Sequence, residues 1–271
     1  MRENEPRLVH VTWWRRLGWT LACLPALLSP AAAADDLCGA TIVSNLKLDH
    51  DLTCAAAGLI VGADGIRINL NGHTIAGSGS GVGIEVAGRT SVSISDGAIS
   101  NFTAGVRVFE STGVVIRGVG FNENNDGVDC QAGCMESTIK GNEFRNNGAR
   151  GIMLRSNSMD NVVKENIFTG NNVGILLFGS IDSTIKENLV SSSTLAGIRL
   201  GVLATGNLIK ENTVGSNPAG IDIAVTPTGS ATGNSVIENT ILMNVCGFRG
   251  PLAGNTVEEN VFGGNETDIC S

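Results

Sequence analysis

The chain repeats one short hydrophobic pattern at nearly constant spacing. A Gly is followed by an apolar residue, a residue expected to face solvent, and a second apolar residue. Successive copies begin 22 to 24 residues apart. The copies are Gly83-Ile84-Glu85-Val86, Gly105-Val106-Arg107-Val108, Gly127-Val128-Asp129-Cys130, Gly151-Ile152-Met153-Leu154, Gly174-Ile175-Leu176-Leu177, Gly197-Ile198-Arg199-Leu200 and Gly220-Ile221-Asp222-Ile223. Such alternation over a few residues predicts short strands.

A second phrase follows about a dozen residues after each Gly phrase. Its copies cover 138–144, 163–168, 185–190, 209–214, 237–241 and 257–262, and weaker phrases at 59–61, 66–75, 92–99 and 114–121 extend the repeat toward the N-terminus. Short strands that cannot bury their apolar side alone must stack on neighbouring copies. We therefore predict an all-β protein, a single-stranded right-handed parallel β-helix of about 8–9 coils of 22–24 residues.

The repeat assigns several residue types to structure. We expect one asparagine per coil to form a hydrogen-bonded ladder, with Gly and Asn recurring because the bends need a positive φ. The ladder members are Asn142, Asn166, Asn188, Asn212, Asn239 and Asn260. Four phenylalanines, Phe121, Phe144, Phe168 and Phe262, are predicted to lie in the core. The longer step from Gly220 to Gly247 predicts a small loop at 226–233.

The N-terminal residues are typical of an export signal. A basic start, an apolar stretch too short to span a membrane and Ala32-Ala33-Ala34 predict a signal peptide over 1–34, and therefore a secreted or periplasmic protein. We expect an N-terminal cap over 35–57 and the β-helix over 58–271. Without residues 1–34 the chain has 14 basic and 24 acidic residues. This acidity argues against nucleic acid as a partner; we expect no membrane span and a monomer.

Six cysteines follow the signal segment, and export favours disulfides. Cys246 and Cys270 are one coil apart, so we expect a bond that locks the C-terminal end. We expect Cys38 to pair with Cys54 in the cap and Cys130 with Cys134 across a tight turn. Other connectivities are possible for six cysteines, and a metal or redox site is the alternative for Cys130 and Cys134.

Charged residues in the outward column are the candidates for chemistry. The column comprises Glu85, Arg107, Asp129, Met153, Leu176, Arg199 and Asp222. One interpretation is a cross-strand charge ladder. The other is a substrate groove with catalytic candidates Arg107, Asp126, Asp129, Arg150 and Arg155 and ligand-binding candidates Glu85, Glu110, Arg199 and Asp222.

Two carboxylates could act as the acid and the base of a hydrolase, and an arginine beside a carboxylate could serve β-elimination from a uronate. A catalytic interpretation requires Asp126, Asp129 and Arg155 in one concave pocket, whereas a ladder would pair them along a flat sheet. We expect no cofactor and no metal site, except that a uronate lyase could use Ca²⁺.

Other polar residues favour structure over function. Lys140, Lys164, Lys186 and Lys210 could suggest a rail for polyanions, but Glu165, Glu187, Glu211, Glu238 and Glu259 run beside them and predict a solvated, neutralised face. His50 and His73 lie in the first coils, away from the acidic segment, and are expected to be structural. The methionines and histidines show no spacing typical of metal ligands.

These phrases, with Leu52-Thr53-Cys54 and the run from Leu70 to Gly77, resemble the right-handed parallel β-helix repeat family over residues 42–265. The resemblance extends to the pectate-lyase-like superfamily, which includes alginate epimerases, rhamnogalacturonan-type hydrolases, periplasmic carbohydrate-binding β-helix proteins and a periplasmic maturation factor for nitrous oxide reductase. It implies the fold and leaves the activity open. The sequence has no Asp-Pro-His as in the epimerases, and no Asp-Asp pair combined with Gly-His as in the polygalacturonase-type hydrolases.

Three functional hypotheses follow. The first is an extracytoplasmic β-helix without catalytic activity that binds a polysaccharide or a protein partner along its flat sheet. The absence of Tyr, and of Trp after residue 34, counts against sugar binding, because aromatic rings usually stack on sugars. The second is a polysaccharide lyase or glycoside hydrolase that acts on acidic glycans. The third is an accessory or maturation factor of the cell envelope.

Overall fold

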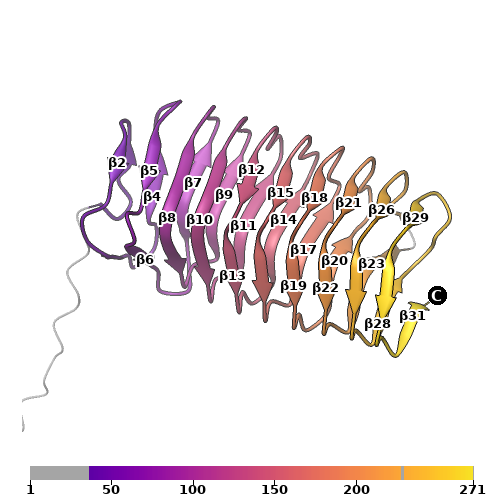
Figure 1. The fold of residues 1–271 in the computed structure, drawn as a ribbon. Coiled ribbons are helices and arrows are strands. Elements are labelled where there is room, and N and C mark those ends of the chain that lie inside the picture. Colours follow the sequence, from indigo (N-terminus) through magenta and orange to yellow (C-terminus); the bar gives the residue numbers. More distant parts are fainter. Residues whose placement is uncertain (1–36, 227–228, 271) are drawn as a thin grey trace, which may run out of the picture. The chain divides into compact units, whose positions relative to one another are not determined.

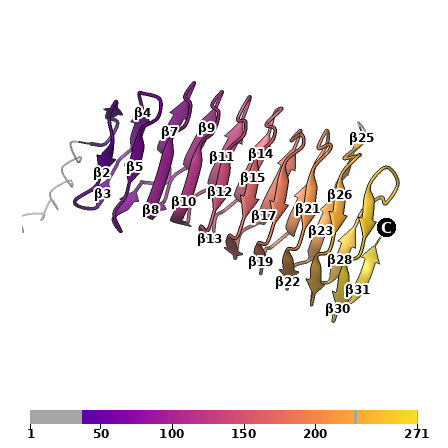
Figure 2. The same ribbon diagram turned by 45° about the horizontal axis from the view of Figure 1, so that its top comes forward.

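The computed structural model describes residues 37–226 and 229–270, so the predicted signal peptide lies outside the described residues. Within these ranges the chain forms strands and turns and no helix. Successive coils stack side by side from one end to the other (Figure 1; Figure 2, turned by 45°). The predicted parallel β-solenoid is confirmed.

The largest sheet, called sheet A, is parallel and has eleven strands, one from each coil. Its strands are β1 (Thr41–Ile42), β4 (Leu59–Val61), β7 (Val82–Ala87), β9 (Ala104–Phe109), β11 (Asp126–Gln131), β14 (Arg150–Arg155), β17 (Val173–Phe178), β20 (Ala196–Leu200), β23 (Ala219–Ile223), β28 (Cys246–Arg249) and β31 (Thr267–Cys270). The predicted 8–9 coils are close to the number observed, and the additional strands of sheet A are β1 and β31 at its two ends.

The other strands build the remaining two faces of each coil, and two long strands, β8 (Ser93–Ser100) and β10 (Val115–Asn122), run through both. Sheet B holds β2 (Leu46–Lys47), β5 (Arg67–Asn69), β12 (Thr138–Lys140), β15 (Val162–Lys164), β18 (Thr184–Lys186), β21 (Leu208–Lys210), β26 (Ser235–Ile237) and β29 (Thr256–Glu258). Sheet C holds β3 (Leu52–Thr53), β6 (Thr74–Ala76), β13 (Glu143–Arg145), β16 (Ile167–Thr169), β19 (Leu189–Ser191), β22 (Thr213–Gly215), β27 (Thr240–Leu242) and β30 (Val261–Gly263).

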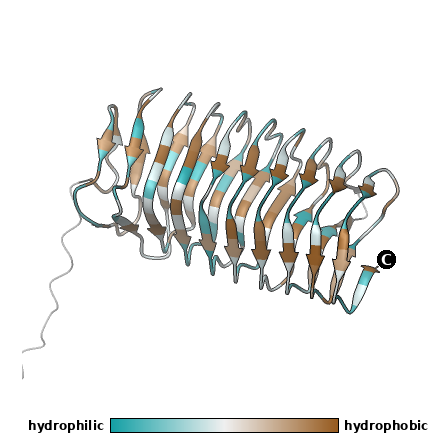
Figure 3. Ribbon diagram, viewed as in Figure 1, coloured by the Kyte–Doolittle hydropathy of each residue, from teal (hydrophilic) through white to brown (hydrophobic). Residues whose placement is uncertain are grey.

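Apolar side chains fill the inside of the solenoid in columns. Figure 3 shows hydrophobic segments recurring at the same places in successive coils. Phe121, Phe144 and Phe168 stack with ring centroids 4.9 and 4.7 Å apart, and all three are fully buried as predicted. Phe262 packs against this core but is only partly buried.

The recurring Gly and Asn follow the predicted cause in part. Several bends do have a positive φ at Gly or Asn, for example at Gly141, Gly170 and Asn146. The Gly of the strand phrase has a different cause: a Cβ atom on Gly127 would come within 2.6 Å of the Phe144 ring and of the Gly151 carbonyl oxygen, so close packing requires glycine there. At the predicted ladder the positive φ falls on the residue before the asparagine, which is a glutamate in five coils and Gly141 in one.

The predicted asparagine ladder is confirmed. Asn142 Nδ2 donates to Asn166 Oδ1 at 3.0 Å, Asn166 donates likewise to Asn188, and the chain of contacts continues to Asn260. The structure adds three shorter runs of hydrogen-bonded asparagines that were not predicted. They are Asn124, Asn147 and Asn171; Asn217, Asn244 and Asn265; and Asn207, Asn234 and Asn255. Buried amides thus satisfy backbone groups at every corner.

All three expected disulfides are present: Cys38–Cys54, Cys130–Cys134 and Cys246–Cys270. The last bond is diagonal, because the register pairs Cys246 with Thr267 and Cys270 with Arg249. The predicted loop is an excursion built on a two-stranded hairpin, β24 (Val225–Thr226) with β25 (Gly229–Ser230). A search for helices long and apolar enough to cross a bilayer finds none in residues 37–226 and 229–270.

Candidate functional site

The outward face of sheet A carries the predicted column of side chains in register. Each member lies beside the next on the neighbouring strand, from Glu85 on β7 to Asp222 on β23. The structure adds Arg249 on β28 as the next member. Arg249 follows Gly247-Phe248 as the other members follow their own Gly and apolar residue. The spacing from Gly220 to Gly247 is longer than that between the other phrases, so the register of Arg249 was not recognised in the sequence.

Asp129 lies between two arginines. Arg155 Nε and Nη2 donate to Asp129 Oδ1 and Oδ2, both at 3.0 Å. On the other side, Arg107 Nε lies 3.8 Å from Asp129 Oδ2, and Arg107 Nη1 lies 3.7 Å from Glu85 Oε2. Only 4% of the Asp129 side chain is exposed. Its charge is neutralised at the sheet surface by the bidentate contact with Arg155.

Asp222 repeats this arrangement toward the C-terminal end. Arg249 Nε and Nη2 donate to its two carboxylate oxygens at 2.9 and 3.0 Å, and Arg199 Nε lies 3.2 Å from Oδ2. Sheet A therefore carries two arginine–aspartate–arginine clusters, one centred on β11 and one on β23.

Asp126 begins β11, and its side chain is buried at the edge of this face. Its carboxylate accepts hydrogen bonds from Arg150 Nη1 at 3.1 and 3.3 Å. Burial nevertheless raises the pKa of Asp126 above its usual value, since desolvation disfavours the carboxylate more than Arg150 favours it. A carboxyl group with a raised pKa is a better proton donor near neutral pH than an ordinary aspartate.

Between the two clusters lies a pocket of about 400 Å³, within the range typical of small-molecule sites, about 300 to 1,000 Å³. Its lining contains two arginines and no aspartate or glutamate. The lining residues are Arg150, Met153, Asn172, Val173, Leu176, Phe178, Leu195, Arg199, Gly201, Val202 and Ala224. Phe178 is 45% exposed, so one aromatic ring faces the pocket and solvent.

The sequence analysis found the arginines but missed this pocket. It placed Leu176 in the outward column and gave Phe178, Leu195 and Val202 no role, because apolar residues near a strand end resemble core. These side chains come from two neighbouring coils, and only stacking brings them together.

The sequence-predicted catalytic residues do not share one concave pocket. Arg150 lines the pocket described above, but Asp126, Asp129 and Arg155 do not, and each of these three is engaged in an ion pair. Glu110 lies apart from the face: it follows β9 at an exposed bend with φ 45°. The ion pairs of Asp126, Asp129 and Arg155 connect neighbouring strands, which is the arrangement that the ladder interpretation expects.

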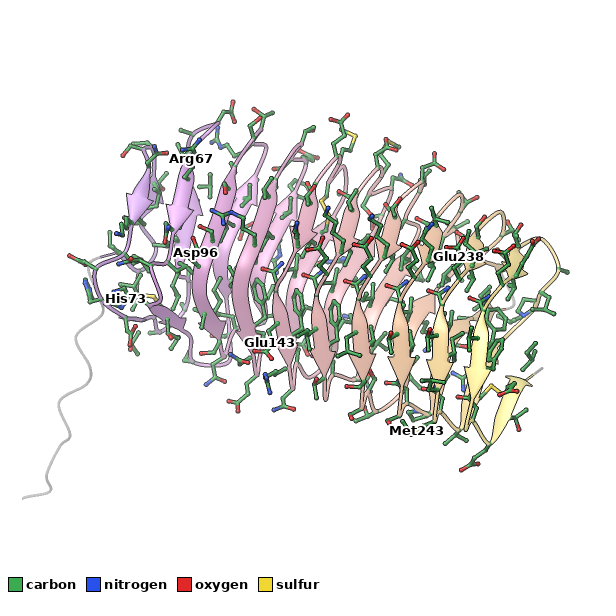
Figure 4. All side chains as sticks on the ribbon, viewed as in Figure 1. Arg67, His73, Asp96, Glu143, Glu238 and Met243 are labelled. Atoms are coloured by element: carbon green, nitrogen blue, oxygen red, sulfur yellow. A yellow bond between two sulfur atoms is a disulfide. The ribbon has the colours of Figure 1, made fainter. Side chains whose placement is uncertain are left out.

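Several other charged groups are paired as well. The lysine column forms contacts with its glutamate neighbours, including Lys140–Glu165 at 3.2 Å and Lys210–Glu238 at 3.4 Å. His73 lies at the N-terminal end of the stack (Figure 4), with Nδ1 3.2 Å from Asp51 Oδ1. His50 Nδ1 lies 2.5 Å from Asp49 Oδ1. Both imidazoles are in the first coils, far along the chain from the pocket.

Comparison with protein families gives a match to NosD, described as a periplasmic copper-binding protein, over residues 65–250. No curated protein matches the chain.

Solved structures share the fold at low sequence identity. An alginate lyase from Paenibacillus sp. has a TM-score of 0.54 at 15% identity, covering 86% of this chain and 90% of the lyase. The A-module of an Azotobacter vinelandii mannuronan C-5 epimerase has a TM-score of 0.51 at 14% identity, covering 86% and 89%. A tailspike protein of E. coli bacteriophage HK620, in complex with a pentasaccharide, has a TM-score of 0.64 at 13% identity, covering 82% of this chain and half of the tailspike.

The described residues do not fit the copper centre that the family description implies. No group of three or more His, Cys, Asp or Glu side chains in residues 37–226 and 229–270 is placed to hold a metal ion. The six cysteines of this part of the chain are all in disulfides. The soft donors that remain close together are Met135 and Met159, stacked on adjacent coils. Two thioethers without a neighbouring imidazole or thiolate make an incomplete copper site.

Proposed function

The chain belongs to the NosD family, and from that premise we propose that it is an extracytoplasmic β-helix protein that binds a polysaccharide along the outward face of sheet A without cleaving it. One observation carries this proposal: the pocket over β14, β17 and β20 combines an exposed aromatic ring with two arginines. Such a mixture of apolar floor and a few polar groups is typical of small-molecule sites.

The shape and chemistry of the pocket support a sugar as its ligand. Leu176 and Phe178 offer apolar surface against which the C–H face of a pyranose can pack. Arg150 and Arg199 lie at the edges, where they can donate hydrogen bonds to ring substituents. Phe178 also removes the objection that aromatic platforms are missing after residue 34.

The similar structures support the proposal only through their fold. The tailspike is described with a bound pentasaccharide, and the lyase and the epimerase are named for their action on alginate or mannuronan. A parallel β-helix is therefore a scaffold on which glycans bind in other proteins. The choice of glycan and the absence of cleavage rest on the pocket and on the paired charges of this chain.

Phe178→Ala tests the proposal directly. We expect it to weaken glycan binding about tenfold, because the ring supplies apolar contact area that a methyl group cannot replace. Binding is measured by calorimetry with the purified protein after a glycan array has identified a ligand. Leu189→Ala is the matched control, since Leu189 is also 45% exposed but lies on sheet C. Equal binding by all three proteins, or no glycan bound by any, contradicts the proposal.

Gly201→Ala offers a second variant that keeps the aromatic ring. A Cβ atom at residue 201 would come within 2.8 Å of the Phe178 ring, so the ring must move away from its present position. We expect binding to weaken while the thermal unfolding midpoint changes little, because the exposed ring can rotate toward solvent. Unchanged affinity in Gly201→Ala together with loss in Phe178→Ala would show that the position of the ring does not matter.

A second candidate function is lyase or hydrolase activity on acidic glycans, and the raised pKa of Asp126 favours it. In β-elimination, a base takes the proton α to the uronate carboxyl, a C=C bond forms and the glycosidic oxygen leaves with a proton. Incubation with uronate polymers tests for it by the absorbance of the unsaturated product and by reducing ends. Activity that Asp126→Asn abolishes would replace the binding proposal. The accessory-factor hypothesis remains a prediction.

A further inference from the structure

Arginines recur on alternate strands of sheet A. They are Arg107 on β9, Arg150 and Arg155 on β14, Arg199 on β20, and Arg249 on β28. The strands between them carry Asp126 and Asp129 on β11, apolar side chains on β17, and Asp222 on β23. Neighbouring strands are about 4.8 Å apart, so arginine-bearing strands are about 10 Å apart.

Strand β17 differs from β11 and β23, the other two strands that lie between arginine-bearing strands, because it carries no carboxylate. Val173, Leu176 and Phe178 project there instead, and they line the pocket. Arg150 and Arg199 are therefore the arginines that flank a strand without an acid. The described ion pair of Arg150 uses Nη1, and that of Arg199 uses Nε, so each guanidinium keeps further N–H groups for a ligand.

Both guanidiniums are held apart by their aspartate partners. Arg150 bonds to Asp126 on β11, and Arg199 pairs with Asp222 on β23, so each side chain is tied to the strand on its far side from β17. A carboxylate contacts an arginine at about 3 Å. A chain with two anionic groups can therefore contact each arginine while both aspartate contacts stay in place.

We propose that the ligand of this pocket is a polyanionic glycan that runs diagonally across the strands, because Arg150 is in register with Val173 and Arg199 with Leu176, three residues further along β17. One anionic group lies near Arg150 and another near Arg199, while the sugar ring between them packs on Leu176 and Phe178. This inference rests on the proposed glycan binding and specifies its substrate class. Carboxylate and sulfate groups share the required chemistry, since arginine binds the oxygens of both.

Binding of a graded series of glycans tests the inference by calorimetry. The series comprises a neutral glucan oligomer, a single uronic acid, linear oligouronates of increasing length and a sulfated glycan. We expect the affinity to increase sharply once an oligouronate is long enough to reach both arginines. Arg199→Gln should then weaken binding of the long oligouronate about tenfold and binding of the neutral glucan hardly at all.

Arg199→Gln carries the test because Asp222 keeps its bidentate contact with Arg249 in that variant. Arg150→Gln should weaken binding to a similar extent. Because this variant also removes the partner of Asp126, its thermal unfolding midpoint is measured to show whether the protein is still folded. Arg117→Gln is the matched control: Arg117 is an exposed residue of β10 with its own acidic neighbour, Asp96, at 3.9 Å. It should bind the oligouronate like the unmodified protein.

The outcomes separate this inference from the function on which it rests. Equal affinity for neutral and anionic oligomers that depends on Phe178 but not on Arg199 overturns the inference and leaves glycan binding intact. No binding to any glycan overturns both. Tight binding of the sulfated glycan together with the oligouronate supports recognition of charge, and binding of the oligouronate alone supports recognition of carboxylates.

Discussion

At the scale of single residues, the outward face of sheet A is organised by buried carboxylates. Asp129 and Asp222 are each held by a bidentate arginine, while Asp126 has a weaker contact with Arg150. At Asp126 desolvation by burial outweighs the contact with Arg150 and raises the pKa of the carboxyl group. A buried acid of this kind makes the stability of the protein depend on pH in a direction opposite to that of most acids.

The native state binds the Asp126 proton more tightly than the unfolded state, whose pKa is near 3.8. The contribution of Asp126 to stability is therefore fully present below that pH and is lost as the pH rises through the higher native pKa. We expect the free energy of unfolding of the unmodified protein, relative to Asp126→Asn, to decrease between about pH 3 and about pH 7. Urea unfolding of both proteins across this range measures it; a relative increase would mean that Arg150 dominates.

The sequence located the charged residues of the site well and its apolar residues poorly. Glu85, Arg107, Asp129, Arg199 and Asp222 could be placed in one column because the Gly phrase fixes their register. Phe178 could not be recognised, because an outward phenylalanine and an inward one look alike in a sequence. The pKa of Asp126 depends on burial by neighbouring coils, which the sequence does not display.

At the scale of elements, the corners of the coils depend on buried amides. Asn166 is 1% exposed, and its Oδ1 accepts hydrogen bonds from the backbone N and the Nδ2 of Asn142 at 2.9 and 3.0 Å. Its own Nδ2 donates to the Ile139 carbonyl oxygen and to Asn188. One side chain therefore connects three coils, which makes the ladder more sensitive to substitution than a surface contact.

Asn166→Ala should lower the free energy of unfolding by about 3 kcal/mol, since it leaves several buried donors and acceptors without partners. Chemical denaturation measures the loss. Asn172→Ala is the control, because Asn172 donates one exposed hydrogen bond, to Thr194 Oγ1 at 2.8 Å; a change of about 0.5 kcal/mol is expected there. Equal losses in the two variants would contradict a cooperative ladder.

The ladder residues were predictable because Asn recurs at a fixed place in the second phrase. The conformation of the bend was not, because nothing in the sequence marks Glu165 and Glu187 as left-handed residues. Gly and Asn are the residues that most readily adopt a positive φ. In this ladder the asparagine instead follows the residue with the positive φ, and its amide is buried.

At the scale of the whole molecule, stability is a sum over coils and their interfaces, so the terminal coils are the weakest. The Cys246–Cys270 disulfide ties β28 to β31 across a separation of 24 residues. We expect it to limit opening at that end without affecting the centre of the stack.

Replacing both cysteines with serine should destabilise the last coil by about 3 kcal/mol, the loop-closure value for this separation. Hydrogen exchange should show faster exchange of amides in β28, β30 and β31, with β14 and β17 unchanged. Loss of protection throughout the stack would instead mean that the solenoid unfolds as one cooperative unit.

The fold class, the approximate number of coils and the Cys246–Cys270 disulfide followed from the repeat, whereas the first strands were not recognised. Strands β1, β2 and β3 have two residues each, too few for alternation to be recognised in the sequence. The register of Cys270 with Arg249 was also hidden, since a diagonal disulfide and a directly stacked one have similar separations in the chain.

The recurrence of arginine on alternate strands sets a rule on how such a chain can change length during evolution. A solenoid can gain or lose a single coil and keep its core, because every coil presents the same apolar columns to its neighbours. A single added coil between β14 and β20 would nevertheless shift Arg199 out of phase with Arg150 for a periodic ligand. Folding therefore tolerates an added coil there, whereas recognition of a polyanion whose charges are spaced to reach both arginines does not.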